Sequence, residues 1–172
     1  AARVGGNSLT EVLVFGKRAG RHAAEAAAGM SFAPADQVEI DAECGRLLGF
    51  LDNPGEGPRP TDLIHRLKDT MGEHVGVVRS DGGLRQALSD IEDIASNGLP
   101  AMSLATSGRV ANYDWIQAVE ISSMAVLAEI VARACLERTE SRGAHYREDH
   151  ADMKDGEWMR NILIRRQDGT LS

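Results

Sequence analysis

Residues 108–139, GRVANYDWIQAVEISSMAVLAEIVARACLERT, form the longest stretch of the chain that favours a single continuous helix. From Ala118 to Ala134 this stretch is apolar on nearly every side. A helix that is apolar all round is typical of a protein interior, so the sequence predicts that this helix lies at the centre of a helical bundle. Its apolar positions are Val110, Trp115, Val119, Met124, Leu127, Ile130, Val131 and Ala134.

Residues 9–28 are predicted to form the first helix of the chain. Ser8 and Glu11 have the spacing of a capping box, with Ser8 as the N-cap residue and the Glu11 side chain reaching back to it. Because each glycine lowers helix stability by roughly 1 kcal/mol relative to alanine, we expect packing against a larger body to compensate. Small residues that would allow this close approach recur at helical spacing: Gly16, Ala19, Gly20, Ala23 and Ala27.

Three more helices are predicted before the central one, at about residues 36–51, 60–71 and 81–96. Ser80 is a typical N-cap residue for the last of them, and the sequence Asn97-Gly98-Leu99-Pro100 is typical of its end. The residues expected to be buried are Val38, Ile40, Leu47, Leu48 and Leu51 in the first, Leu63, Ile64, Leu67 and Met71 in the second, and Leu84, Ala87, Leu88, Ile91, Ile94 and Ala95 in the third.

The fold class that follows is mainly α: an antiparallel bundle of three to four helices, preceded by a separate helix and followed by an irregular tail. In the tail, Ile162–Ile164 is expected to form a short strand that enters a tight turn at residues 167–170. The aromatic fraction of only 4% fits a helical core of small aliphatic side chains better than a β-sandwich.

Composition narrows the possible functions. The net charge of −7 argues against binding to nucleic acid or to an anionic membrane surface. No stretch approaches the roughly 18 consecutive apolar residues of a membrane span. Cys44 and Cys135 have no metal-site or redox-motif spacing and are expected to be small buried thiols in a reducing compartment. We therefore expect a cytoplasmic protein or the soluble part of an assembly. The opening AARVGG, without an initiator methionine, indicates a start inside a longer protein.

The sequence RVGGNSL at residues 3–9 is the first candidate site. Its two glycines allow a ligand to approach the backbone closely. The helix behind it would offer the free amides of Ser8, Leu9 and Thr10 and the positive end of the helix dipole, which together suit an anion. Arg3 could bind a carboxylate through two hydrogen bonds. The alternative is a plain glycine turn leading into a capped helix.

The sequence ESRGAHYREDH at residues 140–150 is the second candidate, because it brings histidines and carboxylates together. Its spacing matches no metal-site signature, so no metal ligand is predicted. The favoured interpretation is a docking segment or a segment whose acidic and basic side chains neutralise one another.

Five segments of the chain resemble, in order, the flavoprotein subunit of the succinate dehydrogenase/fumarate reductase family. They are RVGGNSL at 3–9, VFGKRAG at 14–20, VGVVR at 75–79, ESRGAH at 140–145 and DGEW at 155–158. The resemblance covers essentially the whole chain, and the two motifs near the ends of the chain, RVGGNSL and ESRGAH, are specific.

This resemblance implies that residues 1–33 end an FAD-binding domain, residues 34–140 form its C-terminal helical bundle, and residues 141–172 pack back on the flavoprotein body. It implies FAD as the cofactor and the interconversion of succinate and fumarate by hydride transfer at flavin N5. Arg3 would grip a substrate carboxylate, and Ser8 and Leu9 would lie at the flavin ring. None of the family's catalytic residues is expected within this chain.

The family's dinucleotide-binding motif, flavin-attachment histidine and proton-donating arginine would lie upstream. The resemblance therefore implies two partners, an N-terminal FAD-binding half and an iron–sulfur subunit. It also implies a peripheral position on the inner face of the membrane through such partners, and no activity of this chain alone. One alternative is a fragment of L-aspartate oxidase, whose motif would carry serine in place of Gly6. The other is a non-catalytic helical interaction module, against which the presence of Arg3 argues.

Overall fold

The computed structural model describes residues 7–32, 34–167 and 170–171, and the chain divides into two compact units after Glu43. The first unit contains α1 (Asn7–Ala28) and the first part of α2 (Gln37–Gly49). Because α1 begins at Asn7, Ser8 lies inside its first turn, and the prediction of Ser8 as the N-cap residue is wrong. Sequence places the start of a helix only to within one or two residues. The domain boundaries expected after residues 33 and 140 stay predictions.

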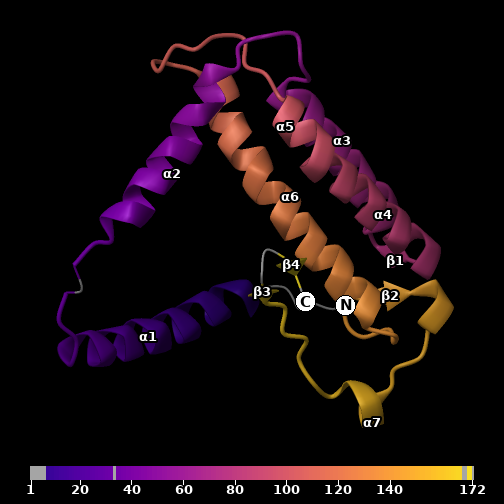
Figure 1. The fold of residues 1–172 in the computed structure, drawn as a ribbon. Helices are drawn as coiled ribbons and strands as arrows, with labels where there is room; N and C mark the ends of the chain where they lie inside the picture. The colour runs from indigo at the N-terminus through magenta and orange to yellow at the C-terminus, as the bar shows by residue number, and fades with distance from the viewer. Residues whose placement is uncertain (1–6, 33, 168–169, 172) are drawn as a thin grey trace. The chain divides into compact units, whose positions relative to one another are not determined.

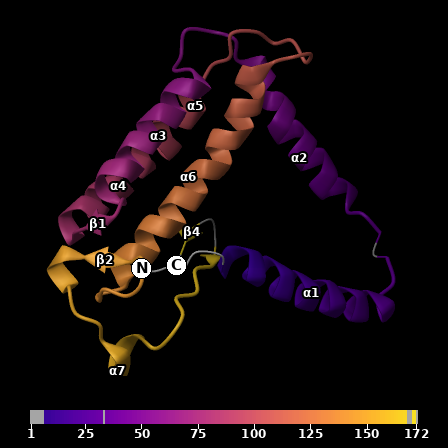
Figure 2. The ribbon, with the colours of Figure 1, turned by 180° about the vertical axis from the view of Figure 1, so that it is seen from behind.

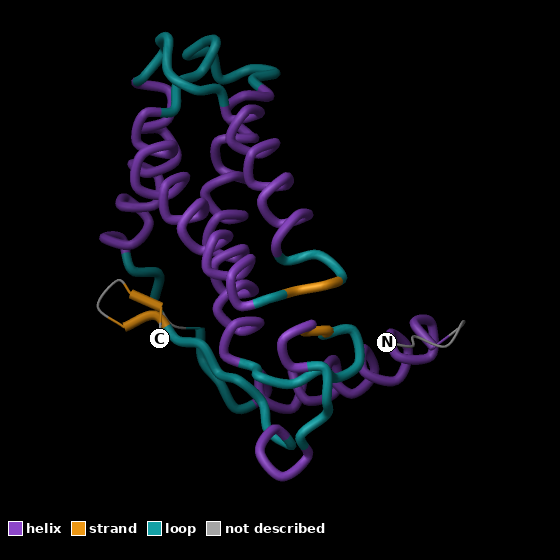
Figure 3. The backbone as a smooth tube through the Cα atoms, turned by 90° about the vertical axis from the view of Figure 1, so that its right-hand side faces the viewer, coloured by secondary structure: helices purple, strands orange, loops and turns teal. Residues whose placement is uncertain are grey.

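The second unit is a bundle of α3 (Pro60–His74), α4 (Asp81–Asp93) and α6 (Tyr113–Glu137), which pack against one another. Figures 1 and 2 show α4 running antiparallel to the other two helices, and Figure 3 shows the same bundle from the side. The mainly α, antiparallel architecture predicted from the sequence is confirmed. None of the helices among the described residues has the length and hydropathy needed to cross a membrane.

The face that α6 buries consists mostly of alanines, which lets α3 and α4 approach closely. The central position of α6 is confirmed. Of the apolar side chains named in this stretch, Trp115 and Met124 pack against the core. Val110, Leu127 and Val131 are 91%, 61% and 44% exposed. The helix is apolar on most sides, so its hydrophobic pattern does not show which face the neighbouring helices cover. The buried residues, which alternate at intervals of three and four, are Ala118, Ile121, Ala125, Ala128 and Ala132.

The apolar face predicted for α2 is largely exposed. Val38 and Ile40 are 77% and 43% exposed and Leu48 is 37% exposed, whereas Leu51, in the 3-10 turn η1 (Phe50–Asp52), is buried. The expected burial was therefore wrong at the first three positions. Helical spacing marks a face that is suited to packing, but burial requires another element to cover it, and no described element covers most of this one.

The helix that starts at α4 continues further than predicted. Ser80 is its N-cap residue, as expected, and its hydroxyl accepts a hydrogen bond from the Gly83 amide at 3.3 Å. The expected end near Asn97 is wrong, because a π-turn, η2 (Ile94–Gly98), leads into α5 (Leu99–Ala101). Gly98 packs closely against α3, since a Cβ atom there would lie 2.9 Å from Leu63 Cδ2.

Short elements complete the second unit at the C-terminal end of α6. The strand β1 (Val78–Arg79) pairs in parallel with β2 (Tyr146–Arg147), and the turns η3 (Glu148–His150) and α7 (Asp155–Trp158) follow. The expected strand at Ile162–Ile164 is wrong: those residues are irregular. The tail strands are instead β3 (Arg166–Gln167) and β4 (Thr170–Leu171), which form an antiparallel pair.

Candidate functional site

The two residues predicted to meet the flavin, Ser8 and Leu9, lie at the N-terminal end of α1. Arg3 lies outside the described residues, while Ser8 and Leu9 lie in the first turn of α1 with their side chains exposed, Leu9 by 70%. The first four amides of a helix have no partner within the helix, and the dipole makes this end positive. The first turn of α1 therefore has the donors and the charge that an anionic ligand requires.

The rest of α1 also exposes the surface that was expected to pack. Leu9, Val12, Leu13 and Phe15 are between 58% and 70% exposed. A Cβ atom added to Gly16 or to Gly20 would meet no described neighbour within 4 Å. An exposed apolar surface of this kind is typical of an interaction site. It supports the prediction that α1 packs against a larger body, which the structure does not test.

The second candidate segment forms a network of charged side chains where α6 ends. Glu140 is fully buried, and its Oε1 accepts hydrogen bonds from Arg138 Nη1 at 2.6 Å and Arg142 Nε at 2.8 Å. Its Oε2 accepts from Arg142 Nη2 at 3.0 Å and from the Lys154 amide at 2.8 Å. The hydrogen bonds from Arg142 are the main reason that the pKa of Glu140 falls to about 2, although burial opposes them. Glu140 is therefore ionised at neutral pH and joins the end of α6 to the start of α7.

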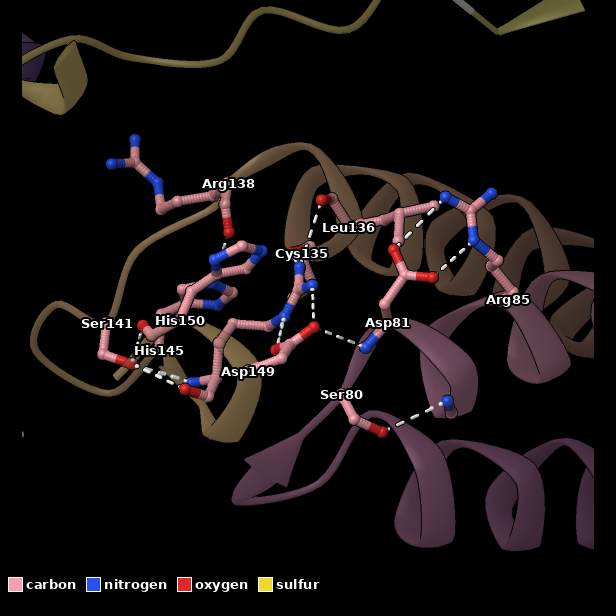
Figure 4. Close-up of polar contacts among 12 residues, drawn as sticks. Ser80, Asp81, Arg85, Cys135, Leu136, Arg138, Ser141, His145, Asp149 and His150 are labelled. Atoms are coloured by element: carbon pink, nitrogen blue, oxygen red, sulfur yellow. Dashed lines mark hydrogen bonds and ion pairs between the residues drawn. The ribbon is translucent and has the colours of Figure 1, made fainter. Parts of the chain in front are cut away.

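Arg147 connects two helix ends in the same network. It is fully buried, and its Nη1 donates to the carbonyls of Cys135 and Leu136, at 2.9 and 3.1 Å, in the last turn of α6. Its Nε and Nη2 donate to Asp149 at 2.8 and 2.6 Å, and Asp149 Oδ2 also accepts from the Asp81 amide that opens α4, at 2.9 Å (Figure 4). The bond from Arg147 holds the pKa of Asp149 far below its usual range.

We call Glu140, Arg142, Arg147 and Asp149 the clasp. It places a guanidinium at the negative end of α6 and a carboxylate at the positive end of α4, which is the favourable sign at each helix end. The clasp therefore fixes the helix ends in place, and the interpretation of this segment as mutually neutralising charges describes it well.

Of the two histidines in this segment, His145 has a local partner. His145 Nε2 lies 3.2 Å from the Arg138 carbonyl, and burial lowers the pKa of His145. Within the ranges that the structure describes, no three His, Cys, Asp or Glu side chains are placed to hold a metal ion. Cys135 is partly buried and burial raises the pKa of its thiol, but Cys44 is exposed, so the expectation of two buried thiols is wrong for Cys44.

The burial of Arg147 was not predicted. The segment was expected to be irregular, and an arginine between polar neighbours is usually exposed. A usable signal was nevertheless present, because arginine and carboxylate alternate at intervals of two in Arg138-x-Glu140-x-Arg142 and in Arg147-x-Asp149. The contacts of these residues with α4 depend on the fold and carry no local signature.

Comparison with known proteins gives consistent matches. Residues 64–172 match the family model described as the fumarate reductase flavoprotein C-term. The chain is similar to one of the subunits of the fumarate reductase (CoM/CoB) of Methanothermobacter marburgensis, with 34% identity over 97% of this chain and 29% of that protein. It is also similar to the fumarate reductase flavoprotein subunit of Mycobacterium tuberculosis, with 33% identity over 99% of this chain and 30% of that protein.

Similarity extends to the three-dimensional structure. The chain superposes on the Sdh1 complex of Mycobacterium smegmatis in its apo form with a TM-score of 0.81 and 32% identity, over 88% of this chain and 25% of that one. The chain thus spans less than a third of the length of the proteins that it matches.

Proposed function

Because the chain belongs to the succinate dehydrogenase/fumarate reductase flavoprotein family, we propose that it forms one side of an FAD-dependent site that interconverts succinate and fumarate. The single observation that carries this proposal is that the sequence RVGGNSL leads directly into the first turn of α1. The remainder of the site would come from the larger part of the flavoprotein, which this chain does not include.

The residues at this end of α1 fit an anionic flavin and an anionic substrate. Ser8 and Leu9 are accessible, and the free amides around them would stabilise negative charge at the pyrimidine end of a flavin ring. Arg3 would bind a carboxylate of the dicarboxylate substrate through two hydrogen bonds and hold the substrate in the orientation needed for reaction. FAD, when bound, supplies the hydride chemistry at N5.

The same proposal includes two protein partners. An N-terminal FAD-binding half would complete the flavin site, and an iron–sulfur subunit would exchange electrons with it and hold the assembly at the inner face of the membrane. The similarity to a chain of the Sdh1 complex of M. smegmatis supports assembly with other subunits.

Substitution of Arg3 by lysine in the complete flavoprotein tests this assignment. Lysine keeps the charge but cannot form the paired hydrogen bonds of a guanidinium, so turnover of succinate or fumarate should fall about a hundredfold or more while bound FAD, measured by its absorbance, is unchanged. The matched control is Arg21→Lys, because Arg21 lies on the exposed surface of α1 and pairs with Glu25. Equal activity of the two variants would refute the role of Arg3.

A further inference from the structure

Trp158, at the end of α7, interacts with two guanidinium groups. The carbon at the centre of the Arg138 guanidinium lies 5.0 Å from the centroid of the indole ring, and that of Arg160 lies 4.7 Å from it. The indole Nε1 donates to Thr139 Oγ1 at 3.2 Å, which fixes the ring, and Trp158 is only 5% exposed. A guanidinium held against an aromatic ring keeps N–H groups that can still donate hydrogen bonds to other partners.

Trp158 and both of these arginines help to line a hollow of about 310 Å³ in the surface of the second unit. Its size is at the lower end of the range for small-molecule sites. Three of its residues are arginines, in a chain whose net charge is −7. The lining consists of Arg138, Arg142, Trp158, Met159, Arg160 and Asn161.

Two of the three arginines are held in place by the fold. Arg138 donates to Glu140, to the Trp158 carbonyl at 3.2 Å and to the Arg160 carbonyl at 2.8 Å. Arg142 donates to Glu140 and to Asp155, whose side chain is 73% exposed. Because the fold already holds these two side chains in place, a ligand would not lose binding free energy by immobilising them.

Arg160 differs from the other two arginines because it has no acidic partner among the residues that the structure describes. Its only described side-chain interaction is with the ring of Trp158. The positive charge of Arg138 and Arg142 is offset by Glu140 and Asp155, so the charge of Arg160 remains available. A planar guanidinium with free donors favours carboxylate or phosphate oxygens.

We propose that this hollow binds a small multivalent oxyanion, carrying carboxylate or phosphate groups, with Arg160 as its principal contact. The Asn161 amide would donate a further hydrogen bond, and Arg142 would become available where the exposed Asp155 moves aside. Anion binding here is independent of the proposed flavin chemistry, since it uses none of Arg3, Ser8 and Leu9.

Isothermal titration of the 172-residue chain with citrate and with pyrophosphate, at low ionic strength, tests the proposal. We expect saturable binding of one anion per chain for at least one of the two probes, and the stronger probe identifies the preferred oxyanion. Raising the NaCl concentration from about 20 to about 200 mM should weaken binding, because salt screens exposed charges.

The decisive comparison is between Arg160→Gln and Arg165→Gln. Both substitutions remove one positive charge from an exposed position in the same tail, but Arg165 does not line the hollow. Arg160→Gln should weaken binding about tenfold or more, and Arg165→Gln less than about twofold. Equal loss in both variants would show attraction to overall charge only and would overturn the proposal, as would the absence of saturable binding for both probes.

Discussion

Replacement of Arg147 by methionine should destabilise the bundle by about 3 kcal/mol. The guanidinium donates to two carbonyls in the last turn of α6 and to both oxygens of Asp149. Methionine retains much of the aliphatic stem and none of these donors. Each carbonyl left without a donor costs about 1 kcal/mol, and loss of the charge partner of Asp149 costs a similar amount. The last contribution is modest because the Asp149 side chain is 30% exposed and water can solvate it again.

Urea unfolding of the 172-residue chain, followed by circular dichroism, measures this change. The midpoint should fall while the slope of the free energy against urea concentration stays constant, since the same surface is exposed on unfolding. Arg133→Met is the matched control, because Arg133 pairs with Glu129 one helical turn away and is 44% exposed. Such a pair contributes about 0.3–0.5 kcal/mol. If the two variants unfold at the same urea concentration, the bonds made by Arg147 do not hold the helix ends and the clasp has no energetic role.

Two further predictions concern the start of α6 and the response to acid. Asn112→Ala should lower the free energy of unfolding by about 2–3 kcal/mol, because the buried side chain accepts from the Trp115 amide at 3.1 Å as the N-cap of α6 and donates to the carbonyls of Thr106 and Gly108 at 2.9 and 2.7 Å. Asn112→Asp keeps the capping oxygen but loses both donors, so it should not restore the wild-type stability; full restoration would contradict the role of the two donated bonds. The pKa of Glu140 is lowered on folding from 4.5 to about 2, so its contribution to stability is present above about pH 4.5 and is lost as the pH falls towards 2. Unfolding free energies measured across this range should decline more steeply for the wild type than for Glu140→Gln, and parallel curves would contradict the assignment.

The parts of the fold that sequence predicts well are those in which the signal is local. Ser80 precedes a run of apolar residues at helical spacing, and the structure places Ser80 at the N-cap of α4 and buries Leu84, Ala87 and Ile91. Both the cap and the spacing are properties of adjacent residues, and they do not depend on what the helix packs against. The central position of α6 is also predictable, because its length and its apolar character are visible directly.

The choice of the buried face of α6 was not predictable in the same way. Ala118 and Ala132 are buried while the larger Leu127 remains 61% exposed. Hydrophobic burial alone favours the larger side chain, by roughly 25 cal/mol for each Å² removed from water. The buried face is the one that α3 and α4 contact, and its small side chains let the three helices approach closely. This arrangement involves three segments at once, which no local pattern contains.

The two candidate sites differ in the same way, because one is a local motif and the other joins distant segments. The RVGGNSL motif was recognisable because its proposed function would require adjacent residues: flexible glycines, an arginine and a helix start. The clasp, in contrast, joins Arg147 to Cys135 and Asp149 to Asp81, over separations of 12 and 68 residues. The only sign of these contacts in the sequence is the alternation of arginines and carboxylates. It indicates that the charges neutralise one another, but it does not indicate which helix ends they bind.

The two ends of the chain therefore differ in which contacts hold their helix ends in place. The clasp finds its donors and acceptors within the second unit, so the position of the helix ends there is set by this chain alone. The first turn of α1 lacks comparable support, because Leu9, Val12 and Leu13 are exposed and Gly16 has no described neighbour. An arginine can orient a substrate only where its backbone is held to within about 1 Å, since larger displacements reduce rates by about a hundredfold. Under the proposed function, a second body that covers the apolar face of α1 would thus be needed to position Arg3, and the grip on the substrate would form only when the flavoprotein assembles.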